Sequence, residues 1–97
     1  MIKYLEKDNL DELISNGLVL VDFYADWCGP CKMLGNVLEA MEDLNVIKIN
    51  TDKFPELARK YGIMSIPTVY IYKDGKELSK FIGFKSKEEI NDLINNI

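Results

Sequence analysis

Apolar and polar residues follow two different periods along the first half of the chain, one typical of strands and one typical of helices. Residues 18–25 form a β-branched and aromatic run whose only charged member is Asp22, which predicts a strand covered on both faces. Residues 46–50 predict a second buried strand. Helical spacing is found after Asp8 as far as Gly17, from Pro30 to about Asp43, and from Phe54 to Gly62. Because strands and helices alternate, we expect parallel strands connected by helices.

The second half of the chain predicts a hairpin and a final helix. Residues 68–72 and 77–82 are strand-like and are joined through Asp74-Gly75, a strong hairpin signal. Ser86 and Glu89 have the spacing of a capping box at the start of a helix. The apolar stripe of that helix consists of Ile90, Leu93, Ile94 and Ile97.

These elements predict an α/β fold in one domain spanning residues 1–97. With a short strand at residues 3–5, the central mixed sheet has four to five strands and is flanked by about four helices. The antiparallel hairpin and the last helix complete the fold. A hydrophobic content of 47% with 29% charged residues is typical of a globular chain and argues against disorder.

Charge and hydropathy exclude some partners. The 12 Lys and Arg against 16 Asp and Glu are interspersed and form no basic stripe, so we expect no nucleic-acid binding. The longest apolar run, residues 18–21, is far too short to span a membrane. The first residues lack the pattern of a secretory signal, which predicts a cytoplasmic protein in a reducing compartment. A monomer is the default expectation.

Cys28 and Cys31 are the two cysteines of the chain, and they lie three residues apart. A structural disulfide is a poor explanation, because closing so short a loop removes only about 1.9 kcal/mol from the unfolded state. A zinc site is also poorly supported, because the chain has no histidine and no second cysteine pair. Metal binding would need carboxylate ligands or a second copy of the chain. Redox chemistry is the remaining interpretation, and it needs no cofactor.

The position of the two cysteines predicts that they differ in reactivity. Pro30 suits the first turn of a helix, so Cys28 is expected just before that helix, where unpaired N–H groups point toward its sulfur. Together with the charge of Lys32, this predicts a pKa below the free value of about 8.5 for Cys28. Cys31 lies one turn further and is expected to be more covered. An exposed, activated thiol with a shielded partner is what two-step thiol–disulfide exchange requires.

Three segments resemble the thioredoxin family: VDFYADWCGPCKM at residues 21–33, KINTD at 48–52 and YGIMSIPT at 61–68. The similarity runs from about residue 18 to residue 83. It implies the thioredoxin fold and a general protein disulfide reductase, in which Cys28 attacks a client disulfide and Cys31 resolves the mixed disulfide. It also implies two kinds of partner, namely client proteins with disulfides and a thioredoxin reductase that restores the dithiol. The chain departs from the family pattern at Tyr24, where many relatives have tryptophan, and at Gly35-Asn36, where a kinking proline is usual.

The resemblance also assigns roles to individual residues. Burial of a carboxylate in an apolar strand should raise the pKa of Asp22, and the family has a buried acid there that serves Cys31 as proton acceptor. From the residues alone, Asp22 could equally be a capped or edge-exposed acid. Lys48 matches the family's lysine near that acid. The resemblance implies a cis peptide bond before Pro67, beside the cysteines. The implied client-binding surface consists of Trp27, Gly29, Pro30, Ile66, Pro67 and Gly83.

Two other readings of the motif remain. A glutaredoxin-like or isomerase-like oxidoreductase would use the same fold, although Gly29-Pro30 between the cysteines favours a reductant. A non-catalytic module that binds partners in the same groove is the alternative outside enzymes. Disulfide reduction with and without Cys28 distinguishes these classes.

Overall fold

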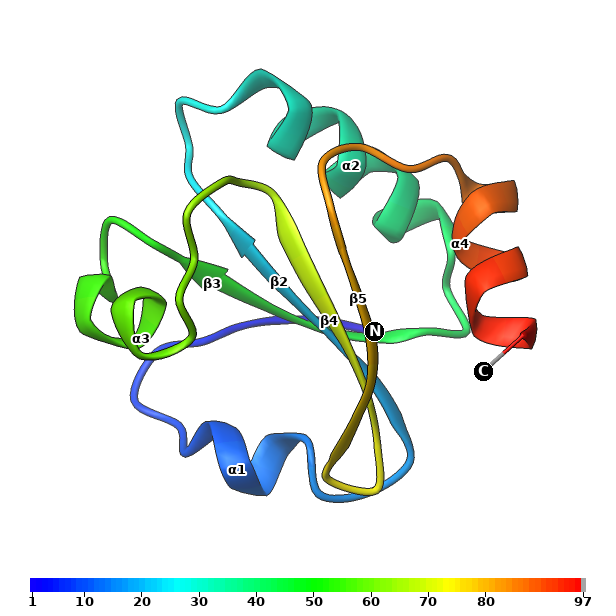
Figure 1. Ribbon diagram of the computed structural model, residues 1–97, viewed down its shortest axis with the longest axis horizontal. Helices are drawn as coiled ribbons and strands as arrows, with labels where there is room; N and C mark the ends of the chain where they lie inside the picture. The colour runs from blue at the N-terminus through cyan, green and yellow to red at the C-terminus, as the bar shows by residue number, and fades with distance from the viewer. Residues whose placement is uncertain (97) are drawn as a thin grey trace.

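The computed structural model describes residues 1–96 as one five-stranded mixed sheet flanked by four helices (Figure 1). The elements in chain order are β1 (Ile2–Tyr4), α1 (Leu10–Leu13), β2 (Leu18–Tyr24), α2 (Gly29–Ala40), β3 (Asn45–Asn50), α3 (Pro55–Lys60), β4 (Thr68–Lys73), β5 (Lys76–Ile82) and α4 (Lys87–Asn95).

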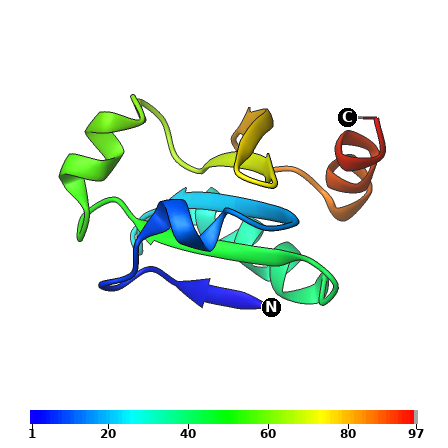
Figure 2. The same ribbon diagram turned by 90° about the horizontal axis from the view of Figure 1, so that it is seen from below.

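The strands lie in the order β1-β3-β2-β4-β5, which Figure 2 shows from the blue strand at one edge to the gold strand at the other. β1, β3 and β2 are parallel, whereas β4 runs antiparallel to both β2 and β5. The predicted mixed sheet with a C-terminal antiparallel hairpin and helix is therefore confirmed. The central strand β2 has parallel β3 on one side and antiparallel β4 on the other. Cys28 lies in the segment between β2 and α2, and Cys31 lies in the first turn of α2.

Both faces of the sheet are covered by helices, which explains why β2 is apolar at nearly every position. α1 and α3 contribute side chains to the core on one face, together with Val19, Val21, Phe23, Ile47, Ile49 and Tyr70. α2 and α4 cover the other face, where the core contains Leu20, Leu34, Leu38, Val46, Ile71 and Ile90.

Three predicted helix boundaries are wrong. α1 is capped by Asn9, whose side chain accepts a hydrogen bond from the N–H of Asp11, and not by Asp8. It ends at Leu13, because Ser15 bonds the carbonyl of Glu12 with both its N–H and its hydroxyl. α2 ends at Ala40 and not near residue 43.

Gly17 does not cap α1 as predicted but pairs with the hairpin at the far end of the sheet. Its N–H donates to Asp74 Oδ1 over 2.7 Å, and the N–H of Asp74 donates back to its carbonyl over 3.0 Å. Asp74 and Gly75 have φ values of 50° and 85°. A two-residue hairpin turn of type I′ requires such positive φ values at both of its central residues. The hairpin signal of the sequence is confirmed.

The edge strand β5 and the last helix complete the structure. The pairing of β4 with β5 contains a register shift between Ile71 and Tyr72, and most side chains of β5 are exposed. The capping box at the start of α4 is present with both of its hydrogen bonds, Ser86 to Glu89 and back. The predicted stripe residue Ile97 lies outside the described residues. Within residues 1–96, no helix has the length and apolar character to cross a bilayer.

Candidate active site

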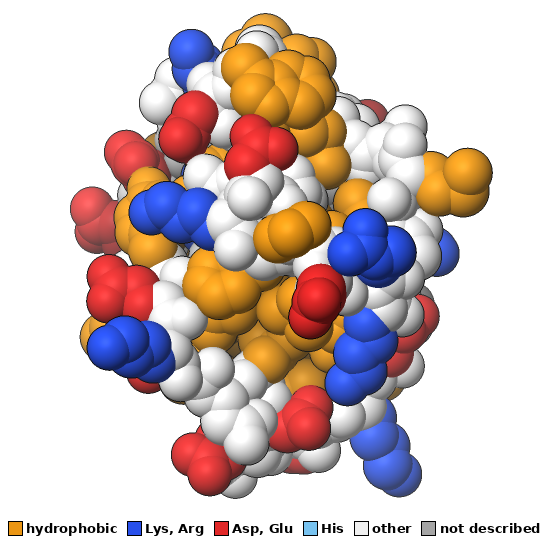
Figure 3. All heavy atoms as spheres, turned by 90° about the vertical axis from the view of Figure 1, so that its left-hand side faces the viewer, with side chains coloured by type: hydrophobic (Ala, Val, Ile, Leu, Met, Phe, Trp, Pro, Cys, Tyr) orange, Lys and Arg blue, Asp and Glu red, His pale blue; other side chains and the backbone are white. Residues whose placement is uncertain are grey.

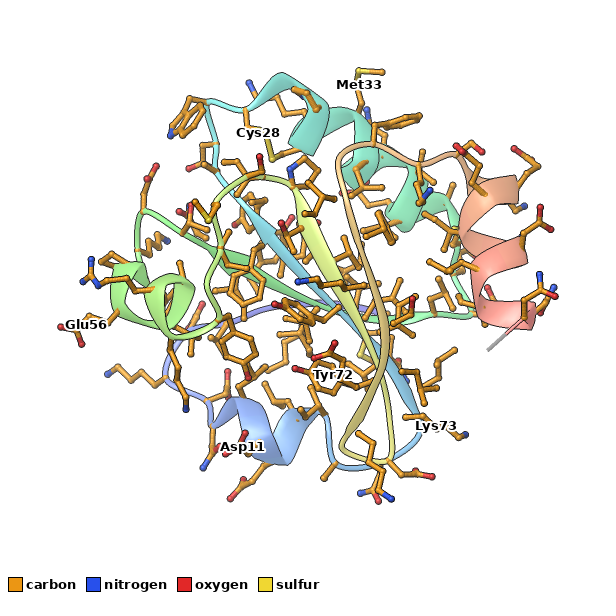
Figure 4. All side chains as sticks on the ribbon, in the orientation of Figure 1. Asp11, Cys28, Met33, Glu56, Tyr72 and Lys73 are labelled. Atoms are coloured by element: carbon orange, nitrogen blue, oxygen red, sulfur yellow. A yellow bond between two sulfur atoms is a disulfide. The ribbon has the colours of Figure 1, made fainter. Side chains whose placement is uncertain are left out.

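Cys28 and Cys31 lie where β2 gives way to α2, and they are joined by a disulfide with their Cα atoms 5.2 Å apart. Cys28 is the N-cap residue of α2, and its Sγ accepts a hydrogen bond from the N–H of Cys31 over 3.2 Å. Pro30 stands in the first turn, as predicted, although the helix begins one residue earlier at Gly29. Figure 4 shows Cys28 at this end of α2, while Met33 points outward from the same helix. A thiolate at Cys28 would therefore accept from the N–H of Cys31 and face the positive end of the helix dipole.

The two cysteine residues differ in exposure less than the sequence predicts. Cys28 is 5% exposed and Cys31 is 1% exposed, so the predicted order is right but the expectation of an openly exposed Cys28 is wrong for this disulfide state. The reason is that both cysteines pack in a small apolar cluster with Ala25, against which Tyr24 and Ile66 also lie.

Asp22 is completely buried beside Lys48. The two residues are register partners on β2 and β3, with Lys48 Nζ 3.7 Å from Asp22 Oδ2. This distance is too long for a hydrogen bond, and neither carboxylate oxygen of Asp22 has a hydrogen-bond partner among residues 1–96. Burial raises the pKa of Asp22 to about 6, and the positive charge of Lys48 limits the rise. The pKa shift has the direction that the apolar strand predicts.

A cavity of about 370 Å³ lies between Lys48 and the second cysteine. Its lining includes Cys31 and Lys48 together with Tyr4, Tyr24, Ala25, Asp26 and Lys32. Asp26, Lys32 and Lys48 offer polar partners in this lining, and a cavity of this volume has room for several water molecules. Asp22 itself does not line the cavity and borders it only through Lys48, whose Nζ is 3.7 Å from Asp22 Oδ2.

The Ile66–Pro67 peptide bond is cis and lies next to the disulfide. The carbonyl oxygen of Ile66 is 3.8 Å from Cys28 Sγ. The N–H of Gly83 donates to the carbonyl of Pro67 over 2.8 Å, and Gly83 has a φ of 89°, a conformation that favours glycine. The structure thus places Ile66 beside Cys28 and joins Gly83 to Pro67, although these residues are far apart in the sequence.

Trp27 stands at the surface beside this site. It is 72% exposed, and its indole N–H donates to Asp52 Oδ2 over 2.9 Å. Gly29 and Pro30 are also exposed. Together with Met64 and Ile66, Trp27 lines a shallow pocket of about 210 Å³. Figure 3 views the molecule from the left-hand side of Figure 1 and shows apolar side chains reaching the surface between charged ones.

Sequence reasoning missed several residues around the site. Asp52 holds the indole of Trp27, and the rings of Tyr4 and Tyr24 lie against the ammonium of Lys48. Tyr4 is placed beside Lys48 by the register of β1 and β3, which cannot be derived from the sequence of either strand. Among residues 1–96, no three His, Cys, Asp or Glu side chains gather as a metal site.

The chain is similar to known proteins over almost its whole length. The family model Thioredoxin matches residues 1–96. The thioredoxin of Chlamydia caviae is 46% identical over 99 residues, which cover 98% of this chain and 97% of that protein. The thioredoxin of Bacillus subtilis is 48% identical over 86 residues, covering 84% of this chain and 83% of that protein.

The fold comparison agrees with the sequence comparison. A mutant thioredoxin from Halobacterium salinarum superposes with a TM-score of 0.88 at 38% identity, covering 98% of this chain and 88% of that chain. With the Cys28–Cys31 disulfide at the start of α2, these similarities establish the activity as thiol–disulfide exchange on protein disulfides. The chain therefore belongs to the thioredoxin family, and it is a protein disulfide reductase.

Proposed function

We propose that Cys28 is the nucleophile of a general protein disulfide reductase, that Cys31 resolves the mixed disulfide, and that a thioredoxin reductase restores the dithiol. The observation that carries this assignment is the hydrogen bond from the N–H of Cys31 to Cys28 Sγ at the start of α2. This donor and the helix dipole favour the anionic form of Cys28, and the thiolate is the reactive form of cysteine.

In the first step, the Cys28 thiolate attacks one sulfur of a client disulfide. A bond forms between Cys28 and that sulfur, the client S–S bond breaks, and the other client sulfur leaves as a thiolate that takes a proton from water. The Ile66 carbonyl, 3.8 Å from Cys28 Sγ, is close enough to the nucleophile to contact a client chain bound there.

In the second step, Cys31 loses its proton to Asp22 and attacks the Cys28 sulfur. The mixed disulfide breaks, the second client sulfur leaves as a thiolate, and Cys28 and Cys31 are joined. Two electrons pass from the protein to the client. Asp22 suits the role of acceptor because its pKa of about 6 lies close to neutral pH, and the cavity between Lys48 and Cys31 provides room for relay by water.

Client recognition is assigned to the surface around the disulfide. An extended client segment can pair its backbone with Ile66 by strand addition, and Pro67 and Gly83 leave the backbone open to close approach. The indole of Trp27, with Gly29 and Pro30, supplies an exposed and weakly polar contact area.

The protein acts as a monomer in the cytoplasm, without a cofactor other than its own disulfide, and binds neither nucleic acid nor membranes.

Insulin reduction in the presence of dithiothreitol tests the proposal. We expect turnover with the wild-type protein and none with Cys28→Ser. Cys31→Ser should instead accumulate a mixed disulfide with insulin, which non-reducing electrophoresis detects. Turnover by Cys28→Ser, or partner binding with no turnover by the wild type, would contradict the proposal. The second result is the one expected of a binding module.

Equilibration of the Cys28–Cys31 couple with glutathione buffers separates a reductase from an isomerase. We expect a potential well below that of the glutathione pool. A potential well above it would instead support an isomerase-like or oxidising role.

A further inference from the structure

Three neighbouring strands place Tyr4, Lys48 and Asp22 in one row across the sheet. Tyr4 on β1 is the register partner of Lys48 on β3, and Lys48 is the register partner of Asp22 on β2. Side chains at matched positions of neighbouring parallel strands project from the same face. This is the face covered by α2, where a Cβ on Gly35 would lie 3.2 Å from Lys48 Nζ.

The ammonium of Lys48 is held between two aromatic rings. Its Nζ is 4.4 Å from the centroid of the Tyr24 ring and 5.7 Å from the centroid of the Tyr4 ring. The two rings meet edge to face, with centroids 6.2 Å apart and an angle of 76° between their planes. Both distances lie within the range in which an ammonium is attracted to an aromatic face.

The Tyr4 and Tyr24 rings hold the Lys48 ammonium in place, whereas the Asp22 carboxylate forms no hydrogen bond with it. The distance of 3.7 Å between Lys48 Nζ and Asp22 Oδ2 exceeds hydrogen-bond length, so no directional bond ties the two groups together. Lys48 also borders the cavity next to Cys31, into which its flexible side chain could turn. The contacts with the rings oppose this movement and keep the positive charge beside Asp22.

We propose that Tyr4 is a positioning residue for disulfide exchange, because together with Tyr24 it holds the Lys48 ammonium beside Asp22 and so controls how readily Asp22 accepts the proton of Cys31. The inference rests on the proposed role of Asp22. It makes the N-terminal strand β1 part of the active site, although β1 is remote from the cysteines in the sequence.

The position of Tyr4 separates this role from core packing. Tyr4 is 51% exposed, so its removal uncovers little of the core. Among residues 1–96, Lys48 is the only residue whose cationic group lies over the Tyr4 ring. The titratable and charged groups that share the site are Tyr24, Asp26, Cys31 and Lys32.

The test compares Tyr4→Leu, which removes the ring, with Tyr4→Phe, which keeps the aromatic face. Ile2→Ala is the matched control, because Ile2 lies on the same strand and packs in the core under α2 and α4. Two quantities are measured for each protein: the titration of the Asp22 carboxyl carbon by NMR in the disulfide form, and the rate of client disulfide reduction against pH.

We expect Tyr4→Leu to raise the pKa of Asp22 above about 6 and to move the pH–rate profile to higher pH, because the ammonium leaves the carboxylate. A rise of about one pKa unit would lower the ionised fraction of Asp22 at pH 7 from about nine-tenths to about half. The rate at pH 7 should then fall roughly twofold, and the difference from the wild type should disappear at pH 9. Tyr4→Phe and Ile2→Ala should titrate like the wild type. In a Lys48→Met background, Tyr4→Leu should cause no further shift.

Three results would overturn the inference: an unchanged Asp22 titration in Tyr4→Leu, an equal shift in Tyr4→Phe, or an equal shift in Ile2→Ala. The last would mean that β1 acts only through stability. Failure of the proposed function is distinct, since it appears as absence of disulfide reduction by the wild type, whereas the NMR titration does not depend on turnover.

Discussion

Replacement of Asp22 by asparagine should make the protein more stable, and increasingly so as the pH rises. Asparagine keeps the shape of the side chain but does not titrate. Burial raises the pKa of Asp22 from 3.8 to about 6. Because the folded-state pKa is the higher one, the protonated acid stabilises the folded protein at low pH, and this contribution is lost as the pH rises through about 6.

The size of the effect follows from the pKa difference. Each pKa unit corresponds to about 1.4 kcal/mol, so ionised Asp22 costs about 3 kcal/mol of folding free energy at pH 8. Part of this cost is already present at pH 4, because the unfolded-state carboxyl is partly ionised there. We therefore expect the advantage of Asp22→Asn to grow by about 2 kcal/mol between pH 4 and pH 8. For a domain of this size, this corresponds to on the order of 10 °C in melting temperature.

Urea denaturation of both proteins in the disulfide form, at several pH values between 4 and 8, measures this difference. The pH dependence carries the test, because any constant effect of the new amide group cancels. Asp43→Asn makes the same chemical change at an exposed position and serves as the control. A stability difference between wild type and Asp22→Asn that stays constant from pH 4 to pH 8 would refute the argument.

Three further changes should separate charge, client contact and helix capping. Lys48→Met removes the charge that limits the pKa of Asp22, so the midpoint of the pH–rate profile for insulin reduction should move to higher pH. An unmoved midpoint would contradict this. Trp27→Ala should lower kcat/KM for insulin by on the order of tenfold, while the free energy of unfolding changes by less than about 1 kcal/mol, since the indole is mostly exposed. A large loss of stability with normal turnover would reverse that assignment. Ser86→Ala removes the cap of α4 and should cost about 1 kcal/mol in urea denaturation with insulin reduction unchanged.

Much of the fold follows from local patterns in the sequence. The apolar run around Asp22 identifies the central strand, Asp74-Gly75 identifies the hairpin, and Ser86 with Glu89 identifies the start of the last helix. Each of these signals acts between residues close in the chain, and each is confirmed. The helix ends were less predictable, because a single alternative hydrogen bond, such as that of Ser15 to Glu12, ends α1 one turn early.

The candidate site was predictable where a motif carries it and hidden where tertiary contacts build it. The two cysteines and the buried acid follow from the sequence, whereas the contact of Tyr4 with Lys48 depends on strand register. The bond from Trp27 to Asp52 joins the segments after β2 and β3, whose spacing depends on the whole sheet. The low exposure of Cys28 arises from its packing with Ala25 and Ile66.

The outer strand β5 bears on how the protein avoids aggregation. An open sheet edge offers its unpaired backbone groups to any extended polypeptide, including unfolded clients and other copies of the same chain. Here that edge carries the charged side chains of Lys76, Glu77 and Lys80, and the register shift at Ile71/Tyr72 interrupts its pairing with β4. Such charges and irregularities discourage the growth of a sheet by addition of further strands. Because a disulfide reductase meets other polypeptides in the course of its reaction, these features of β5 reduce the tendency of its sheet edge to pair with an extended client chain.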